Sequence, residues 1–258
     1  MRFQLFAART AFAALILAVL AGTAAVAGVR LGQLTGETGS NLMIPATGLG
    51  LVALALALLW LRSALARNAG EGKRVGLVAL IGSLVFLYHP LTYVYYGYVR
   101  LPIHDATTAP EDAPQFVALA KIPTANSRVF DATRKIAYKG EEVTLAYAFR
   151  EEYAALTKPH AALLVSPQKA FWRCFERVKT LGWTVVDARE KDLRIEATDK
   201  SLWFGRISDI VIRVRPAGTT GSRVDVRSQS REGAHDHGRN AARIKKLVTA
   251  SGCQTPNS

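Results

Sequence analysis

The chain has few cysteines, and its first hundred residues have few charges. Two cysteines, Cys174 and Cys253, among 258 residues are too few for a disulfide-rich scaffold or a cysteine-based zinc module. Residues 1–99 hold seven Lys or Arg and two Asp or Glu, whereas residues 100–258 hold twenty-six and eighteen. This uneven distribution excludes a single soluble globule, and long apolar runs beside a mixed-charge half exclude a disordered, collagen-like or coiled-coil chain. No glycine-rich phosphate loop follows a predicted strand, which argues against nucleotide binding.

Three apolar segments without Asp, Glu, Lys or Arg lie in the first hundred residues. They cover residues 11–29, 43–61 and 75–98. Each approaches the ~20 residues that an α-helix needs to cross the ~30 Å hydrocarbon core of a bilayer. We therefore predict a three-helix transmembrane anchor over residues 1–99. Pro90 predicts a kink or a helix end in the third segment, and His89 is the single His or charged residue in the three segments, which argues against ion transport by the anchor alone.

The basic residues beside these segments predict their orientation. Arg2 and Arg9 precede the first segment, and four basic residues accompany Glu71 in the second loop. The positive-inside rule places both regions in the cytoplasm, so the third helix leads the rest of the chain across the membrane. In a Gram-negative bacterium that side is the periplasm. The first segment also resembles a signal peptide that ends at Ala25-Val26-Ala27; we favour an uncleaved helix, and both alternatives place the rear domain on the same side.

The charged rear half is predicted to contain a linker and a folded domain. Four prolines interrupt the polar region that follows the third segment, which predicts an extended linker or wrap over residues 100–140. Residues 141–258 then form the domain. Its first element is a predicted helix over residues 141–156. Cys174 falls on the apolar face of a second predicted helix and is typical of a small core residue, although a bridge to Cys253 stays open in an oxidising compartment.

The fold class of this domain follows from local patterns. Ser166 and Pro167 predict the start of the second helix, and Gly182 predicts its end. Alternating apolar and polar residues predict strands, and these cover residues 183–188, 193–198, 210–215 and 224–229. A last helix begins near Asp236. The order of these elements predicts an α+β fold, with an antiparallel sheet covered on one face by helices.

A dense motif spans residues 227–244 and reads RSQSREGAHDHGRNAARI. It resembles the signature of the domain of unknown function 1499 family, Arg-Ser-x-Ser-Arg-x-Gly-x-x-Asp-x-Gly-x-Asn-x-x-Arg-Ile, and every fixed position is present. The Trp-Phe-Gly at residues 203–205 also looks like the family, and the resemblance covers about residues 166–250. Ser208 departs from it, since the family often has Asp-Asp there. The resemblance implies kinship and a membrane anchor like that of many bacterial members, but no known activity.

Seven signature residues and one upstream aspartate form a candidate polar site. The set is Arg227, Ser228, Ser230, Arg231, Asp236, Asn240, Arg243 and Asp209. Asp236, Asn240 and Arg243 share one face of the last helix by their spacing, and Asp236 is placed to cap that helix. Guanidinium groups, hydroxyls and a helix N-terminus are the parts of an anion site. The alternative, which we favour, is a structural network in which these residues satisfy one another.

Catalytic and metal-binding interpretations have less support. Ser228 or Ser230 with His235 and an aspartate lacks the nucleophile elbow that would support a triad. His235 and His237 have no third metal ligand that the sequence identifies. We therefore predict no catalytic residue, no metal and no cofactor.

These observations predict a non-enzymatic protein of the bacterial inner membrane. Its periplasmic α+β domain would serve as a binding or structural module, with the lipid bilayer as one partner. An anionic envelope component or another membrane protein would be the second. The rear half carries a net charge of +8 (26 − 18), but its predicted location argues against nucleic acid. A hydrolase-like enzyme that uses the Ser, Asp and Arg residues of the signature is the alternative.

Overall fold

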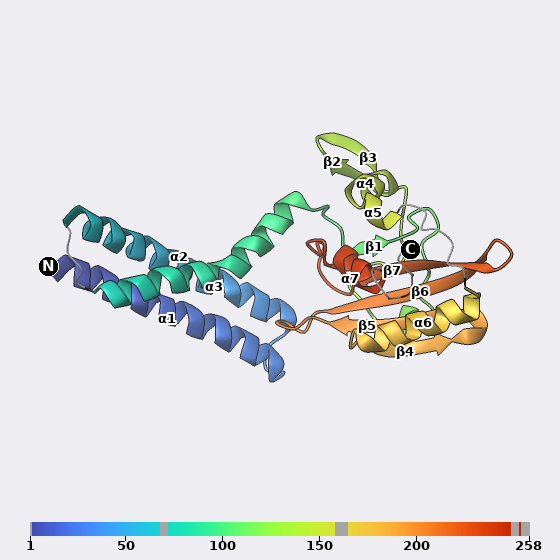
Figure 1. Ribbon diagram of the computed structural model, residues 1–258, viewed down its shortest axis with the longest axis horizontal. Helices are drawn as coiled ribbons and strands as arrows, with labels where there is room; N and C mark the ends of the chain where they lie inside the picture. The colour runs from blue at the N-terminus through green and yellow to red at the C-terminus, as the bar shows by residue number, and fades with distance from the viewer. Residues whose placement is uncertain (1, 68–71, 158–164, 249–252, 254–258) are drawn as a thin grey trace. The chain divides into compact units, whose positions relative to one another are not determined.

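A computed structural model describes residues 2–67, 72–157, 165–248 and 253 (Figure 1). The chain divides into two compact units. The first comprises Met1–Tyr98 and Leu202–Gly205, and the second comprises Val99–Ser201 and Arg206–Ser258. The division separates the apolar front of the sequence from its charged rear.

The first unit contains three long helices: α1 (Arg2–Arg30), α2 (Gly36–Arg67) and α3 (Lys73–Val99). All three are long and apolar enough to cross a membrane, which confirms the three predicted apolar helices. Of the two outcomes predicted at Pro90, a kink or a helix end, the helix end is wrong, because α3 continues through Pro90 to Val99. Figure 1 shows α3 bent along its length, as expected of a helix with an internal proline.

Small residues let the three helices approach one another closely. Ala11, Ala57 and Ala79 form a buried contact between α1, α2 and α3. At Gly76 an added Cβ would lie 2.3 Å from Cδ2 of Trp60, so only glycine leaves room for the indole ring. Large apolar side chains point outward instead, and these include Leu20, Ile44 and Val85. This inside-small, outside-apolar pattern is the one that helices surrounded by lipid adopt.

The second unit is an α+β domain built on a five-stranded antiparallel sheet of order β1-β7-β6-β5-β4. The strands are β1 (Asp105–Thr107), β4 (Thr184–Arg189), β5 (Arg194–Lys200), β6 (Ile207–Ala217) and β7 (Gly221–Ser230). A separate hairpin pairs β2 (Lys135–Tyr138) with β3 (Glu141–Thr144). The helices are α4 (Leu145–Glu152), α5 (Ala154–Thr157), α6 (Pro167–Thr180) and α7 (Arg239–Val248), with short 3-10 turns η1 (Leu119–Lys121) and η2 (Glu190–Asp192).

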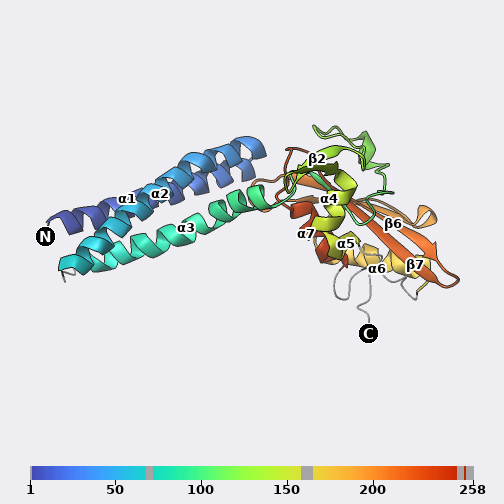
Figure 2. The same ribbon diagram turned by 90° about the horizontal axis from the view of Figure 1, so that it is seen from above.

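Helices α6 and α7 cover one face of the sheet, which confirms the predicted α+β class. Ser166 caps α6 as predicted, with its Oγ accepting from the N–H of Lys169 at 3.3 Å. Phe171 of α6 and Ile244 of α7 pack with the strand residue Ile210 in a single buried core. Figure 2 shows these helices on one side of the sheet and the segment that follows α3 on the other.

Two local predictions differ from the structure. The predicted helix over residues 141–156 starts later, because Glu141–Thr144 pairs with β2 as a strand before α4 begins. Strand β1 was not predicted, since three residues are too few to show a period and only pairing with β7 defines them.

The second face of the sheet is covered by the segment between β1 and β2. Phe116 and Leu119 of this segment are buried against Val211 of β6. The face therefore lies inside the domain, and its polar side chains are buried. We call residues 108–131 the covering segment.

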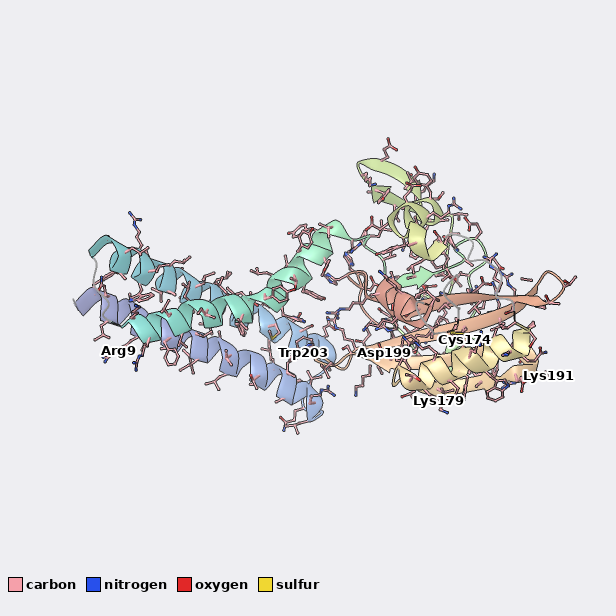
Figure 3. The ribbon with its side chains drawn as sticks, viewed as in Figure 1. Arg9, Cys174, Lys179, Lys191, Asp199 and Trp203 are labelled. Atoms are coloured by element: carbon pink, nitrogen blue, oxygen red, sulfur yellow. A yellow bond between two sulfur atoms is a disulfide. The ribbon has the colours of Figure 1, made fainter. Side chains whose placement is uncertain are left out.

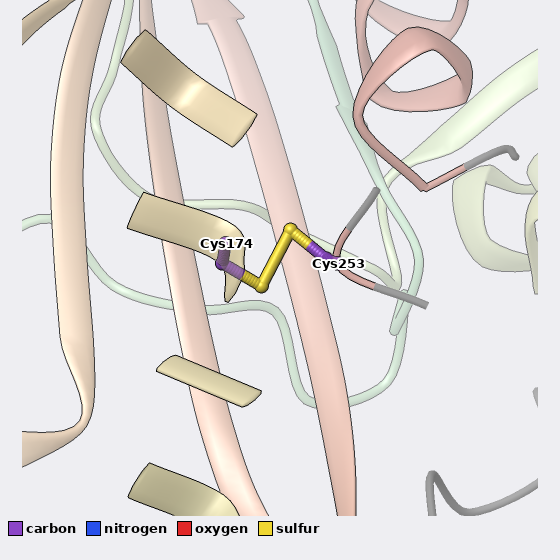
Figure 4. The surroundings of a disulfide bond; sticks show 2 residues. All are labelled: Cys174 and Cys253. Carbon is purple, nitrogen blue, oxygen red and sulfur yellow. A yellow bond between two sulfur atoms is a disulfide. The ribbon is translucent and has the colours of Figure 1, made fainter. Parts of the chain in front are cut away.

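Cys174 and Cys253 form a disulfide that joins α6 to the end of the chain, with Cα atoms 4.4 Å apart (Figure 4). Both side chains are fully buried. The disulfide settles the alternative that the sequence left open for Cys174.

Candidate functional site

Strand β7 divides the signature between the two faces of the sheet. Successive side chains of a strand point to opposite faces, so Arg227 and Arg231 lie on one face and Ser228 on the other. The strand register places Asp105, Gln229 and Asp209 in one row across β1, β7 and β6. The single cluster predicted from the sequence is therefore two networks, one beneath the covering segment and one beneath α7.

The first network centres on Arg227, the largest fully buried side chain of the described residues. Its Nη2 donates to Asp105 Oδ2 at 2.6 Å, and its Nε donates to Asp105 Oδ1 at 3.0 Å. The guanidinium also donates to the backbone carbonyls of Pro114 and Arg128. The ring of Phe116 lies 5.0 Å from the guanidinium carbon, within range of a cation–π interaction. Arg227 thus binds β1 and the covering segment to β7.

Asp209 forms the other half of this network. Arg231 approaches it with two nitrogens, with Nη2 at 2.9 Å from Oδ1 and Nε at 3.0 Å from Oδ2. Nη1 of Arg128, in the covering segment, lies 2.7 Å from Asp209 Oδ2 and also donates to Gln229 Oε1 at 3.1 Å. Gln229 in turn donates to Asp105 Oδ2 at 3.0 Å. The covering-side network is therefore Asp105, Arg128, Asp209, Arg227, Gln229 and Arg231.

The second network centres on Asn240, whose side chain is fully buried at the start of α7. Its Oδ1 accepts from Ser228 Oγ at 2.8 Å and from Arg243 Nη1 at 2.7 Å. Its Nδ2 donates to Ser230 Oγ at 3.0 Å and to the backbone carbonyl of His104 at 2.8 Å. One amide group thus joins α7 to β7 and to the residue that precedes β1.

Asp236 caps α7, as the sequence predicted. Its Oδ2 accepts from the N–H of Asn240 at 2.9 Å, and its Oδ1 accepts from that of Gly238 at 2.8 Å. Burial raises the pKa of Asp236 above its ordinary value of 3.8, although these two backbone donors act in the opposite direction. Gly238 has φ near +76°, a conformation that favours glycine, and lies between Asp236 and α7.

Arg243 completes the second network. Its Nε donates to Asp199 Oδ2 at 2.7 Å, which links α7 to the end of β5. The α7-side network is therefore Asp199, Ser228, Ser230, Asp236, Asn240 and Arg243. His104, beside this network, has its pKa lowered by burial, against the opposing influence of Asp105.

The arginines of both networks are paired with carboxylates of the domain itself. Each guanidinium of the candidate set faces a carboxylate of the same domain: Arg227 faces Asp105, Arg231 faces Asp209, and Arg243 faces Asp199. These three ion pairs join residues that are 122, 22 and 44 positions apart in the sequence. Residues 105–250 match the model of a protein family, DUF1499, whose description is "protein of unknown function".

The chain belongs to the DUF1499 family. No curated protein and no solved structure matches the chain significantly. The matched region begins at Asp105, so both networks lie within it and the three long helices lie outside it.

The contacts of the serines and histidines in this DUF1499 domain differ from those of a catalytic triad. Ser228 Oγ donates to Asn240, and His235 Nδ1 accepts from the N–H of His237. The His235 and His237 rings stack, with centroids 4.4 Å apart. Among the described residues, no group of three His, Cys, Asp or Glu side chains is arranged to hold a metal ion.

Several network residues were missed by the sequence analysis. Asp105 and Arg128 lie in the predicted linker, and Asp199 lies one residue beyond the strand predicted over residues 193–198. Glu196 is a polar position of the alternating strand predicted over residues 193–198, a pattern that favours exposure, yet it is fully buried and accepts from the N–H groups of Val117 and Leu119, at 2.8 Å each. A signal was present, because three neighbouring strands carry charges of both signs on one face, which is typical of a covered polar surface.

Proposed function

We propose that the protein is a membrane-anchored, non-enzymatic module whose DUF1499 domain stands outside the cytoplasm and binds a polar or anionic partner of the cell envelope. One observation carries the proposal. The charged signature residues Arg227, Arg231 and Arg243 are bound to carboxylates of the domain itself. These residues shape the domain, and the partner is bound elsewhere on its surface.

The α7-side contacts support this assignment over the hydrolase-like alternative. Ser228 Oγ uses its proton in a bond to Asn240 Oδ1, and the Asp236 carboxylate accepts two backbone N–H groups. A serine nucleophile requires a general base at its hydroxyl, a position that Asn240 holds here. The hydroxyl and the carboxylate therefore have structural partners in place of catalytic ones.

Two features support a location outside the cytoplasm. The basic residues near the N-terminus and between α2 and α3 favour the cytoplasmic side for both. The Cys174–Cys253 disulfide is typical of oxidising compartments such as the bacterial periplasm. Alkaline phosphatase joined after Ser258 should be active in cells, because the enzyme requires export. Activity absent from this fusion and fluorescence from the matching green fluorescent protein fusion would contradict the proposed topology.

The partner surface is proposed to be the outer side of α6 and α7. Exposed basic side chains there include Lys169 on α6 and Lys246 on α7, and the Arg177 guanidinium joins the two helices by donating to the carbonyl of Lys246 at 2.8 Å. Positive charge concentrated on one surface favours an acidic partner. Inorganic polyphosphate is a suitable probe, added to the full chain in neutral-lipid nanodiscs.

A matched pair of variants tests this surface. Lys246→Glu and Lys191→Glu each change the net charge by the same amount, and both lysines are exposed, but Lys191 lies in η2 beyond the end of β4. We expect Lys246→Glu to weaken polyphosphate binding and Lys191→Glu to leave it nearly unchanged. Equal weakening by both variants would show an effect of net charge alone and would contradict a defined binding surface.

A further inference from the structure

The loop between β5 and β6 has an apolar tip that the proposed function does not use. Leu202, Trp203, Phe204 and Gly205 form this tip. Leu202 is 69% exposed and Trp203 is 50% exposed, although both belong to residue types that folded domains usually bury. We propose that this tip inserts into the interfacial region of the lipid bilayer that the three helices cross. The inference rests on the proposed membrane anchor and adds a second point of membrane attachment.

The loop is a closed structure that presents its apolar side chains together. The N–H of Ser201 donates to the carbonyl of Arg206 at 2.9 Å, and the N–H of Arg206 donates to Ser201 Oγ at 2.9 Å. Gly205 has φ near +59°, which permits the tight return of the chain. These bonds hold the tip at the end of a paired β-hairpin, so its exposure does not depend on an unstructured segment.

The register of the sheet shows at which end of the domain this tip lies. Thr198 pairs with Asp209, Asp209 with Gln229, and Gln229 with Asp105. The tip therefore projects from the end of the sheet where the chain enters β1. Only five residues lie between Val99, the last residue of α3, and Asp105, and the six Cα–Cα steps that join the two residues span at most ~20 Å. The tip thus lies on the side of the domain that is tethered to the helices.

The tip also groups with the helices rather than with the sheet. Leu202–Gly205 belongs to the first compact unit, together with α1, α2 and α3. Within that unit the Trp203 ring meets the His89 ring edge-on, with centroids 5.9 Å apart. Tyr95 and Tyr96 follow on the same helix and are largely exposed. Trp and Tyr side chains favour the membrane–water interface because their rings are apolar and carry a polar group.

The opposite end of β6 provides an internal comparison. Its loop to β7 consists of Gly218, Thr219 and Thr220, which are exposed and polar. In Figure 3 Asp199 and Lys191 lie at opposite ends of the sheet. The two ends of one sheet thus carry opposite chemistry, with the apolar tip at the tethered end. Lys200 and Arg206 flank the tip and add the positive charge that anionic lipid headgroups attract.

Site-directed spin labelling of the full chain tests the inference. Trp203→Cys, Thr219→Cys and Leu51→Cys are each labelled with a nitroxide without reductant, because the native cysteines are bonded to each other. The protein is placed in vesicles of phosphatidylcholine and phosphatidylglycerol. Collision with oxygen reports lipid, and collision with a water-soluble nickel chelate reports solvent. Leu51 on α2 is 46% exposed and serves as the lipid reference, and Thr219 serves as the water reference.

We expect the label at residue 203 to collide severalfold more with oxygen, relative to the nickel chelate, than the label at residue 219. Leu202→Cys should give the same result from an independent position. A label at residue 203 that matches residue 219, while residue 51 reports lipid, would overturn the inference and leave the anchor intact. A label shielded from both reagents would show burial against protein and would also overturn it. If residue 51 reports solvent, the proposed anchor itself fails.

Discussion

Arg227 of β7 and Asp105 of β1 form a bidentate ion pair in the interior of the DUF1499 domain, with Nη2 at 2.6 Å from Oδ2 and Nε at 3.0 Å from Oδ1. Asp105 opens the first strand after the three long helices, and Arg227 opens the motif over residues 227–244. The pair therefore connects the segment that follows α3 to this motif. It also holds the edge strand β1 in place, which three residues of pairing alone would do weakly.

Removing Asp105 should destabilise the domain strongly. Asp105→Ala leaves the guanidinium of Arg227 buried without its carboxylate, which we expect to lower the free energy of unfolding by about 3–5 kcal/mol. The measurement is denaturant unfolding of the full chain in detergent, followed by the fluorescence of Trp172 and Trp183.

Asp112 provides the control for this variant. It pairs with Arg213 and Arg215 but is exposed, so its ion pairs are screened by solvent. Asp112→Ala should lower the free energy of unfolding by about 1 kcal/mol or less. Equal losses from the two variants would contradict a special role for the buried pair.

The cap at Asp236 predicts different results for two substitutions. Asp236→Ala removes both acceptors from the start of α7 and should cost about 0.5–2 kcal/mol of stability. Asp236→Asn keeps one acceptor oxygen and removes a charge whose burial is unfavourable, so its loss should be smaller. Thermal unfolding of both variants checks the order, and an unchanged melting temperature for Asp236→Ala would sink the structural interpretation of this residue.

The buried imidazole of His104 predicts a loss of stability in acid. Burial lowers the pKa of His104 below its ordinary value of 6.5, so the unfolded chain binds a proton at a pH where the folded domain does not. The free energy of unfolding should therefore fall as the pH decreases through 6.5 toward the lowered pKa. His104→Gln should reduce this slope, measured by unfolding at a series of pH values.

Asp236 has the opposite sign and serves to separate the two effects. Its pKa is raised, so the folded domain binds a proton before the unfolded chain does, and this group favours folding as the pH falls toward 3.8. In the Asp236→Asn variant, the dependence of the free energy of unfolding on pH should retain the contribution of His104. A slope that His104→Gln leaves unchanged in both backgrounds would rule out the imidazole as its source.

The contact between Gly76 and Trp60 predicts a defect in helix packing. A Cβ at residue 76 would lie 2.3 Å from the indole ring, so Gly76→Ala must displace Trp60 and should cost about 1–3 kcal/mol. At Gly48 an added Cβ meets nothing within 4 Å, and Gly48→Ala should be neutral or stabilise α2 by up to about 1 kcal/mol. Thermal unfolding in detergent compares the two, and a similar response to both would argue against close packing at Gly76.

Local patterns in the sequence determined the longer helices and strands. The three apolar runs determined the long helices, because backbone hydrogen bonds in lipid must be satisfied within a segment. Ser166 and Asp236 marked helix starts, since a capping side chain acts on N–H groups only a few residues away. Period-two alternation predicted the four long strands, because this signal also depends only on residues that are close in the sequence.

Tertiary structure alone decided which of these residues meet. The sequence placed Arg227, Asp209 and Asn240 in one cluster, but the alternation of β7 and its register with β6 divide them between opposite faces. The partner of Arg227 is Asp105, 122 residues away, and no local period encodes that distance. The alternating pattern of the strands predicts that their charged residues are exposed, but the covering segment buries them. Burial of that face depends on long-range packing, and this is the physical reason that a predicted site became two structural networks.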